Sequence, residues 1–393
     1  MYRARLCENQ TLHTQSNFRL LIVRLGAMGD ILHALPAVTA LRLAHPDWQI
    51  GWVVEPRWQP LLKAGNGELN AGDREQGTGN RKEPGFAMPG RNSAMPVRDA
   101  AMPVVDRLHF APSREWKRHP LSSATRRAIG ALRRELRAAE YSAVLDLQGA
   151  IRSAVISRMS GCPRRIGEAS PREWPAQWLF TERVVTHGAH VIEQDVELAS
   201  ALAGDALSAV DAQLPIDPDA EAWCATWLAD TFPGTSRPIA LVTPGAGWGA
   251  KRWPPERYAA VAEGLAQRGL HAVVNAGPGE EALAAAIASA GAVALTATLP
   301  QLIALTRRIA LCIGGDTGPL HLASALGRRV VGIYGPTDPS RNGPYGTRAR
   351  VLRSPDSRRD HSRRSEPEPG LLTIAPDDVL HAADELLAEE DAR

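Results

Sequence analysis

The sequence predicts an α/β protein made of two Rossmann-like domains of similar size, joined by a linker. Short runs rich in β-branched residues alternate with helix-length amphipathic segments, which is the pattern of βαβ units on a parallel sheet. This alternation stops after about residue 204 and restarts at about residue 238. The chain has 393 residues, which is more than one hydrophobic core usually holds, so a division into two domains is expected.

The first domain is predicted over residues 19–204. Its expected strands and helices are, in order, RLLIVRL, ILHALPAVTALRLA, QIGWVV, VVDRLHF, SSATRRAIGALRRELRAAE, SAVLDLQ, GAIRSAVISRMS and RRIGE. Residues 1–18 lack the apolar core of a signal peptide and are expected to be a disordered extension. Residues 63–101 lose all periodicity and are rich in Gly, Asn, Arg and Pro, which is typical of a flexible insertion.

Residues 205–237 are the expected linker, because Pro-rich turns there surround one short helix. The second domain is predicted over residues 238–353. Its expected elements are, in order, PIALVTP, PPERYAAVAEGLAQRG, HAVVNAG, EEALAAAIASA, AVALTA, LPQLIALTRRIA, ALCIGGD, PLHLASALG and RVVGIYGP. The charged residues 354–370 are expected to be mobile, and residues 371–393 are expected to form a closing helix.

Composition argues against several classes of function. A net charge of only +2 is not that of a dedicated nucleic-acid-binding protein. The four cysteines are scattered, without a CxxC pair, and are expected to be buried. No apolar run reaches the ~18 residues that a membrane span needs. No histidine cluster has the spacing of metal ligands, and Asp217 with Asp219 fits a helix start better, so neither a metal nor a cofactor is predicted.

Three loops at the carboxyl ends of predicted strands are candidates for a ligand site, because open α/β sheets bind ligands there. The first loop, RLGAMGDILH, contains Gly26, Gly29 and Asp30. It lacks the G-x-G-x-x-G spacing of a dinucleotide-binding loop. Asp30 is expected either to cap the following helix with its carboxylate or to take part in catalysis.

The other two loops lie in the predicted second domain. TPGAGWGAKRW offers glycine N–H groups and Lys251 to a phosphate, although an ordinary βα connection with a solvated Lys-Arg pair is the alternative. GGDTGPLH places Thr317 and Gly318 at a helix N-terminus, where free N–H groups and the helix dipole attract anions. Capping of that helix by Asp316 or Thr317 is the structural alternative. The tryptophan-bearing segments WVVEPRW and REWPAQW are expected to be core or cleft wall.

Together these motifs resemble the ADP-heptose glycosyltransferases of glycosyltransferase family 9. The resemblance extends from about residue 19 to 346 and rests on LLIVRLGAMGDILHALPAV, VLDLQGAIRSA, KRWPPERY, and GGDTGPLHLASALG followed by VGIYGPTDP. It implies a GT-B fold, in which an N-terminal domain that binds the acceptor faces a C-terminal domain that binds the nucleotide sugar. It also implies transfer of L-glycero-D-manno-heptose from ADP-heptose to the keto-deoxy-octulosonate (Kdo) of lipid A, with inversion and without an essential metal. DLQGAIRSA resembles the enzymes that add the first heptose (heptosyltransferase I) more than those that add the second.

The resemblance implies roles for individual residues as well. Asp30 aligns with the general base that takes the proton from the acceptor hydroxyl. The residues implied to bind the donor are Thr243, Gly245, Lys251, Glu280, Asp316, Thr317, Gly318 and His321. The residues implied to hold the anionic acceptor are Arg24, Arg172 and His190. The sequence departs from the family pattern in the 63–101 insertion and in TPGAGWGAK, which replaces a Thr-rich donor loop.

Three partners are implied: the ADP-heptose donor, the Kdo-lipid A acceptor, and the cytoplasmic face of the inner membrane. The basic segment TRRAIGALRRELR is expected either to attach the protein peripherally to that anionic surface or to be a solvated helix face. Heptosyltransferase II, or another ADP-sugar transferase, is the nearest alternative function. A nucleotide-binding protein without turnover is disfavoured by the intact Asp30, Lys251 and DTG-x-x-H set, and an NAD-dependent oxidoreductase by the missing dinucleotide loop.

Overall fold

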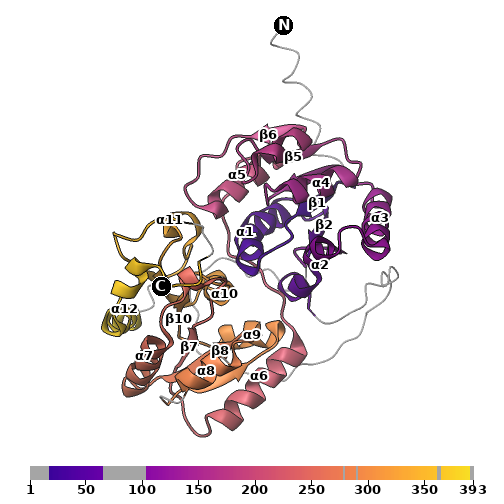
Figure 1. Cartoon of the computed structure of the whole chain (residues 1–393). Coiled ribbons are helices and arrows are strands. Elements are labelled where there is room, and N and C mark those ends of the chain that lie inside the picture. The colour runs from indigo at the N-terminus through magenta and orange to yellow at the C-terminus, as the bar shows by residue number, and fades with distance from the viewer. Residues whose placement is uncertain (1–16, 65–102, 278, 289–290, 361–363, 390–393) are drawn as a thin grey trace, which may run out of the picture.

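The structure, a computed structural model, describes residues 17–64, 103–277, 279–288, 291–360 and 364–389. These residues form two α/β domains that lie side by side, the first in indigo and magenta and the second in orange and yellow (Figure 1). Each domain contains one six-stranded sheet, and every strand pair in both sheets is parallel. The predicted α/β fold with two parallel sheets is confirmed.

The first sheet has the strand order β3-β2-β1-β4-β5-β6. Its strands are β1 (Arg19–Val23), β2 (Gln49–Val54), β3 (Arg107–Phe110), β4 (Ala143–Asp146), β5 (Arg165–Glu168) and β6 (Glu182–Val184). The central strand β1 is apolar at four successive positions because both of its faces are covered. Leu20 and Ile22 pack into one core and Leu21 and Val23 into another, and none of the four has exposed area.

Helices cover the two faces of this sheet. They are α1 (Met28–Ala44), α2 (Ser113–Arg118), α3 (Ser123–Ala138), α4 (Ile151–Met159) and α5 (Val191–Ala203), with the short 3₁₀ helices η2 (Pro56–Leu61) and η3 (Trp174–Leu179). The buried residues of α1 and α5 share the core of Leu20 and Ile22, whereas α3 and α4 contribute to the core of Leu21 and Val23.

The second sheet has the order β12-β11-β10-β7-β8-β9. Its strands are β7 (Ile239–Thr243), β8 (His271–Ala276), β9 (Val293–Thr296), β10 (Leu311–Gly315), β11 (Arg329–Tyr334) and β12 (Ala349–Arg353). The helices are α6 (Pro218–Thr231), α7 (Pro255–Gln267), α8 (Glu281–Ala288), α9 (Leu299–Thr306), α10 (Gly318–Ala325), α11 (Pro339–Asn342) and α12 (Pro376–Ala388), with the 3₁₀ helices η4 (Gly249–Lys251) and η5 (Pro369–Thr373). Residues of α7, α8 and α12 share one core on this sheet, and residues of α6, α9 and α10 share the other.

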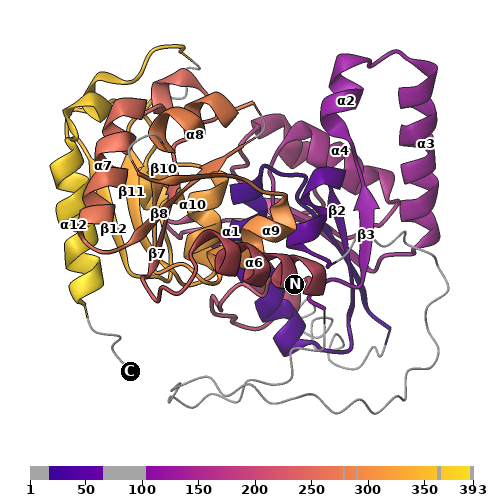
Figure 2. The same cartoon turned by 90° about the horizontal axis from the view of Figure 1, so that it is seen from below.

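Both sheets have the same topology. The first strand of each domain lies at the centre beside the fourth, so β1 pairs with β4 and β7 pairs with β10. In this strand order the crevice outside the carboxyl ends of the central strands is the usual ligand site. The three glycine loops found in the sequence leave β1, β7 and β10, so the fold brings all of them to such positions. Figure 2 shows the two domains from below.

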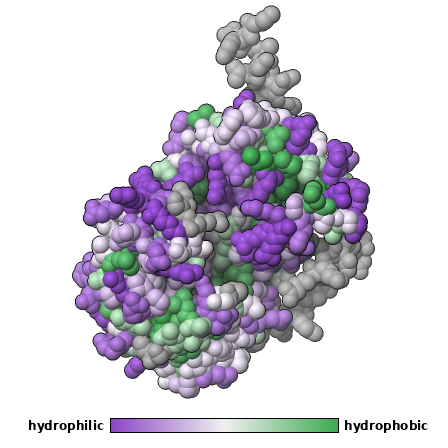
Figure 3. Space-filling view, in the orientation of Figure 1, coloured by the Kyte–Doolittle hydropathy of each residue, from purple (hydrophilic) through white to green (hydrophobic). Residues whose placement is uncertain are grey.

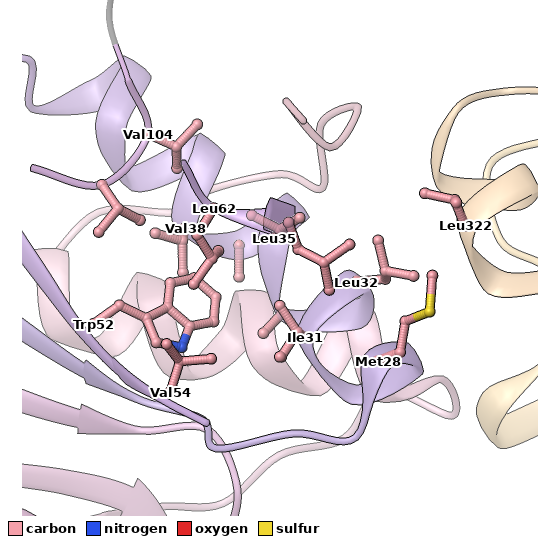
Figure 4. Close-up of a cluster of buried hydrophobic side chains, with 14 of the residues drawn as sticks. Met28, Ile31, Leu32, Leu35, Val38, Trp52, Val54, Leu62, Val104 and Leu322 are labelled. Atoms are coloured by element: carbon pink, nitrogen blue, oxygen red, sulfur yellow. The ribbon is translucent and has the colours of Figure 1, made fainter. Parts of the chain in front are cut away.

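The two domains are joined by a continuous apolar core. One buried cluster contains residues of α1, including Leu32 and Leu35, together with Leu322 of α10. Figure 4 shows Met28 extending from the start of α1 toward the part of the second domain that bears Leu322. The start of α1 is therefore at the contact between the domains.

Several elements differ from the sequence-based expectations. Helix α1 begins at Met28 instead of Ile31, and the strands β6 and β12 and the helix α5 are not predicted from the sequence pattern. The helix expected in the linker 205–237 is α6, which has 14 residues and packs against α9 of the second domain. Most of the expected extension (residues 1–16) and of the expected insertion (residues 65–102) lies outside the described residues.

The surface is mostly hydrophilic in the orientation of Figure 1, with one hydrophobic area over α4 and another over the lower part of the second domain (Figure 3). Among the described residues, no helix is both long enough and apolar enough to cross a bilayer. Three of the four cysteines, Cys162, Cys224 and Cys312, are described, and all three are buried free thiols, as expected.

Candidate active site

The N-termini of two helices from different domains meet at the candidate site. A Cβ atom on Gly29 of α1 would lie 2.6 Å from Cδ2 of His321 on α10. A Cβ atom on Gly318, the first residue of α10, would lie 2.6 Å from Sδ of Met28 on α1. Only glycine fits at either position without displacing the neighbouring side chain. The first turn of α1, which contains Asp30, therefore packs directly against the first turn of α10.

Both carboxylate oxygens of Asp30 have a partner in the opening loop, and the side chain is still partly exposed. It is the third residue of α1, and Oδ2 accepts a hydrogen bond from the N–H of Ala27 at 2.8 Å. The guanidinium of Arg24 donates to the main-chain oxygen of Asp30 at 3.0 Å and lies 3.5 Å from Oδ1. The Asp30 side chain is 35% exposed, whereas that of Arg24 is 7% exposed. Ala27, not Asp30, occupies the N-cap position, and Asp30 caps from inside the helix while still reaching solvent.

The loop after β4 supports the opening loop from the side. Oε1 of Gln148 accepts the N–H of Leu25 at 2.8 Å. The buried carboxylate of Asp146 fixes this loop, because it accepts the N–H groups of Gln148 at 3.0 Å and Gly149 at 2.9 Å, and the Ser153 hydroxyl at 3.0 Å. Burial raises the pKa of Asp146 to about 6 despite these bonds. The motif DLQGAIRSA thus shapes the site, a role that its sequence did not reveal.

On the second domain, Asp316 connects a lysine and a histidine at the end of β10. Its Oδ2 is paired with Nζ of Lys251, and its Oδ1 lies 2.9 Å from Nε2 of His321. All three side chains are at most 10% exposed. Burial opposes ionisation of Asp316, but the hydrogen bonds and charges of His321 and Lys251 outweigh it and hold the pKa of Asp316 below its ordinary value. Nζ of Lys251 also lies 4.2 Å from the ring centroid of Trp248.

Buried polar atoms without a hydrogen-bond partner gather around the ends of β10 and β11. Among the described residues of this region they are Oγ1 of Thr317, Nδ1 of His321, the hydroxyl of Tyr334 and Oγ1 of Thr337. Such atoms are normally satisfied by protein, water or ligand. Thr317 is the N-cap residue of α10, but its hydroxyl makes no capping hydrogen bond. The helix N-terminus and the hydroxyls of these residues therefore offer unused donors to an oxygen-rich ligand.

The remaining predicted donor residues fall into two groups. A Cβ atom on Gly245 would lie 2.4 Å from Oε2 of Glu280, which accepts the N–H of Gly277 at 3.0 Å, so the first glycine loop touches this acid. Thr243 instead points into the sheet, where its buried hydroxyl lies 3.4 Å from the carbonyl oxygen of Ile313 on β10. The structure therefore gives the Thr243 side chain a role within the sheet and not at the surface of the loop that follows β7.

The charged segment after β12 covers the loop that contains Lys251. The N–H of Ala250 donates to the carbonyl oxygen of Arg364 at 3.1 Å, and the N–H of Glu368 donates to the carbonyl oxygen of Ala250 at 3.1 Å. Two residues of the segment 354–370, which was expected to be mobile, are thus hydrogen bonded to the loop that contains Lys251. Backbone pairing, which does not depend on side-chain composition, accounts for the difference.

The predicted acceptor residues are not all available to a ligand. Arg172 is exposed. His190 is buried at the N-cap of α5, where Nδ1 lies 3.2 Å from the N–H of Ile192 and Nε2 lies 3.0 Å from the carbonyl oxygen of Gly343 in the other domain. In this structure His190 is an interdomain contact. Its ring also lies 5.5 Å from that of His33, which is 4.6 Å from that of His321.

One buried acid near the site is not predicted from the sequence. Asp195 of α5 is 3% exposed, and its Oδ2 has no hydrogen-bond partner among the described residues. Burial raises its pKa to about 7, the charge of Arg24 opposes this rise, and the charge of Asp30 adds to it. The signal was present in the sequence, because Asp195 falls on the apolar face of α5 between Ile192 and Ala199.

No group of three or more His, Cys, Asp or Glu side chains in the described ranges is arranged to hold a metal ion. Asp217, the first acid of the Asp-x-Asp pair, is the N-cap of α6 and accepts the N–H of Ala220 at 3.0 Å, as expected for a helix start.

Comparisons with known proteins agree on one family. The model of "Glycosyltransferase family 9 (heptosyltransferase)" matches residues 129–371. Lipopolysaccharide heptosyltransferase 1 of Pseudomonas aeruginosa is 28% identical over 343 residues, covering 84% of this chain and 81% of the relative. The enzyme of the same name from Escherichia coli is 28% identical over 351 residues, covering 86% and 94%. Lipopolysaccharide heptosyltransferase 2 of Salmonella typhimurium is 29% identical over 296 residues, covering 69% and 81%.

Solved structures share the same fold. The E. coli heptosyltransferase WaaC with ADP-2-deoxy-2-fluoro heptose superposes with a TM-score of 0.67 at 24% identity, covering 94% of this chain and 99% of the other. The E. coli ADP-heptose lipopolysaccharide heptosyltransferase II gives a TM-score of 0.68 at 21% identity, covering 95% and 100%. The two facing Rossmann-like domains are those of the GT-B fold.

Proposed function

This chain belongs to glycosyltransferase family 9, and we propose that it is an inverting transferase that moves L-glycero-D-manno-heptose from ADP-heptose to the Kdo of lipid A. The observation that supports this proposal best is the contact between α1 and α10. It brings the first turn of α1, which bears the partly exposed Asp30 carboxylate, against the first turn of α10, where the proposed anion site lies. An inverting transfer needs a base on one side of the sugar and a charge-stabilising site on the other.

Asp30 is the proposed general base. Its carboxylate takes the proton from the acceptor hydroxyl as that oxygen attacks the anomeric carbon of the donor. The N–H of Ala27 and the guanidinium of Arg24 fix the orientation of the carboxylate, and its partial exposure leaves room for the hydroxyl. Both restraints come from the chain segment of the base itself, so the carboxylate keeps its position when the acceptor is absent.

Lys251 and the N-terminus of α10 are the proposed stabilisers of the leaving group. Negative charge grows on the β-phosphate of ADP as the bond to heptose breaks. The ammonium of Lys251 and the free N–H groups at Thr317 and Gly318 oppose this charge in the place that a divalent cation takes in other transferases. Glu280, which lies against Gly245, is proposed to contact the donor. We propose that the reaction needs no metal.

The proposed acceptor is anionic and lipid-linked. The exposed side chain of Arg172 can pair with a Kdo carboxylate, whereas Arg24 is already bonded to Asp30 and would have to share its guanidinium. Because the acceptor is embedded in lipid, we propose that the protein works on the cytoplasmic face of the inner membrane as a peripheral protein. A heptosyltransferase 2 acceptor is the second candidate, since that relative is 29% identical.

The proposal is tested with a panel of ADP-, UDP- and GDP-sugars, Kdo-lipid A as acceptor, and nucleotide release as the readout. ADP-heptose with Kdo-lipid A is expected to give the fastest release, which continues unchanged in EDTA. Turnover only on an acceptor that already bears one heptose would favour the second candidate. Activity that disappears with EDTA and returns with Mg²⁺ would contradict the metal-free mechanism.

A further inference from the structure

An exposed apolar patch lies on the first domain, where α4 and η3 meet. Ile151 and Val155, one turn apart on α4, are 44% and 43% exposed. Trp174 and Trp178 of η3 are 60% and 67% exposed, and their ring centroids are 4.6 Å apart in an edge-to-face arrangement. Both tryptophans of the segment REWPAQW therefore lie on the surface, and the expectation that they belong to the core is wrong.

The two parts of this patch form one surface. α4 packs against η3, and Glu173 joins their starts, because its carboxylate accepts the N–H of Ile151 at 2.8 Å and its N–H donates to the carbonyl oxygen of Gly149 at 2.9 Å. Figure 3 shows hydrophobic side chains gathered over α4 within a largely hydrophilic face. The name apolar patch is used below for Ile151, Val155, Trp174 and Trp178.

A strongly basic hairpin stands beside the apolar patch. Residues 113–138, which form α2, α3 and their connection, contain eight Lys or Arg and two Glu, a net charge of +6 in a chain whose total is only +2. α3 packs against α4, and Figure 2 shows α2 and α3 side by side. The exposed arginines of α3 are Arg126, Arg127, Arg133, Arg134 and Arg137. At the connection, Leu121 is 83% exposed.

An anionic bilayer fits this combination better than a protein surface does. Tryptophan favours the boundary between lipid headgroups and acyl chains, and clustered lysines and arginines are attracted to anionic headgroups. A second copy of this chain is a poor occupant, because a symmetric contact through the apolar patch would bring two hairpins of charge +6 together. The charge of the hairpin and the apolar area of the patch both favour a bilayer, which has anionic headgroups at its surface and acyl chains directly below them.

The apolar patch is also connected to the loop that bears the candidate base, Asp30. Gln148 holds Leu25 of the opening loop, and α4 begins three residues later at Ile151. A bilayer in contact with the apolar patch would therefore lie against an element whose start is close to the opening loop.

We propose that the apolar patch and the basic hairpin together dock the protein on an anionic bilayer. Trp174 and Trp178 enter the boundary between headgroups and acyl chains, and the arginines of α3 lie at the lipid phosphates. That the bilayer holds the acceptor rests on the proposed function; the docking itself does not.

The test is cosedimentation of the full chain with phosphatidylcholine vesicles, with and without phosphatidylglycerol, at low and high salt. We expect the double variant Trp174→Ser/Trp178→Ser to lose about tenfold or more in affinity for anionic vesicles at both salt concentrations, because its apolar area no longer leaves water. Arg133→Glu/Arg134→Glu should weaken binding at low salt and have little effect at high salt. Ile216→Ser, which removes a 56% exposed apolar residue outside the apolar patch, is the control and should bind like the wild type.

Ile151→Ser/Val155→Ser provides an independent variant on the other element of the apolar patch and should weaken binding in the same way. The docking proposal is wrong if both double variants bind vesicles like the wild type. It is also wrong if the wild-type chain is a dimer that the tryptophan substitutions dissociate. Heptose transfer to a water-soluble Kdo acceptor without acyl chains separates the docking proposal from the proposed function. The variant Trp174→Ser/Trp178→Ser should retain this transfer. If the wild type binds vesicles but does not catalyse this transfer, the proposed function is contradicted and the docking proposal is not.

Discussion

The pair formed by Lys251 and Asp316 gives the most quantitative prediction about the proposed donor site. The two side chains are only 10% and 8% exposed, so neither charge can return to water when its partner is removed. Lys251→Met keeps the packing of the side chain but leaves the Asp316 carboxylate with His321 as its remaining partner. Breaking a buried ion pair from one side costs about 3–5 kcal/mol, so we expect this loss in the free energy of unfolding. Removing both charges in Lys251→Met/Asp316→Asn should restore at least half of the lost free energy of unfolding.

Affinity for ADP distinguishes the structural role of Lys251 from its role in binding. Because the double variant recovers stability but still lacks the ammonium, both variants should bind ADP about tenfold or more weakly. Denaturant unfolding gives the stability and calorimetric titration gives the affinity. A double variant that is no more stable than Lys251→Met would refute the buried-pair reasoning. A double variant that binds ADP like the wild type would refute the phosphate contact.

Two further predictions concern the packing and charge around the site. Gly29→Ala should displace the His321 ring, because the new methyl would lie 2.6 Å from Cδ2, and a shift near 1 Å is expected to lower turnover about 100-fold. Its control is Gly130→Ala on α3, where the nearest atom would lie 3.8 Å from the new Cβ. Turnover of this control should be unchanged, and its denaturant unfolding should show about 0.5–1 kcal/mol of added stability. Asp195→Asn should stabilise the protein at pH 8 by up to about 4 kcal/mol and much less at pH 4. The pKa of Asp195 is raised from its ordinary value of 3.8 to about 7 in the folded protein. The wild type therefore loses stability as the pH rises from about 3.8 to about 7. Equal denaturant midpoints of variant and wild type at both pH values would contradict this prediction.

The sequence predicted the two parallel sheets well because each central strand is buried on both faces. Runs such as Leu20–Val23 are apolar at every position, and the glycine loops that follow them mark the strand ends. The same loops carry Asp30, Lys251 and Asp316, so the main candidates for the site were found from local patterns. The clusters that these residues form depend on strand order, which right-handed crossovers restrict to a few arrangements but do not fix.

The contacts between the domains could not be predicted in this way. Nothing local in the sequence indicates that His190 bonds to Gly343 or that Gly29 lies against His321, because these partners are far apart in the chain. The exposure of Trp174 and Trp178 was missed for a related reason. Their apolar character predicts burial, but no part of the described chain covers them.

The general-base role of Asp30 is the central claim, and the turnover of Asp30→Asn tests it most directly. Asparagine can still accept the N–H of Ala27, so the start of α1 is expected to keep its structure. We predict a fall in kcat of about 10²–10⁴ with ADP affinity within a few-fold of wild type, because only the proton acceptor is lost. Near-normal turnover of this variant on ADP-heptose and Kdo-lipid A would contradict the account.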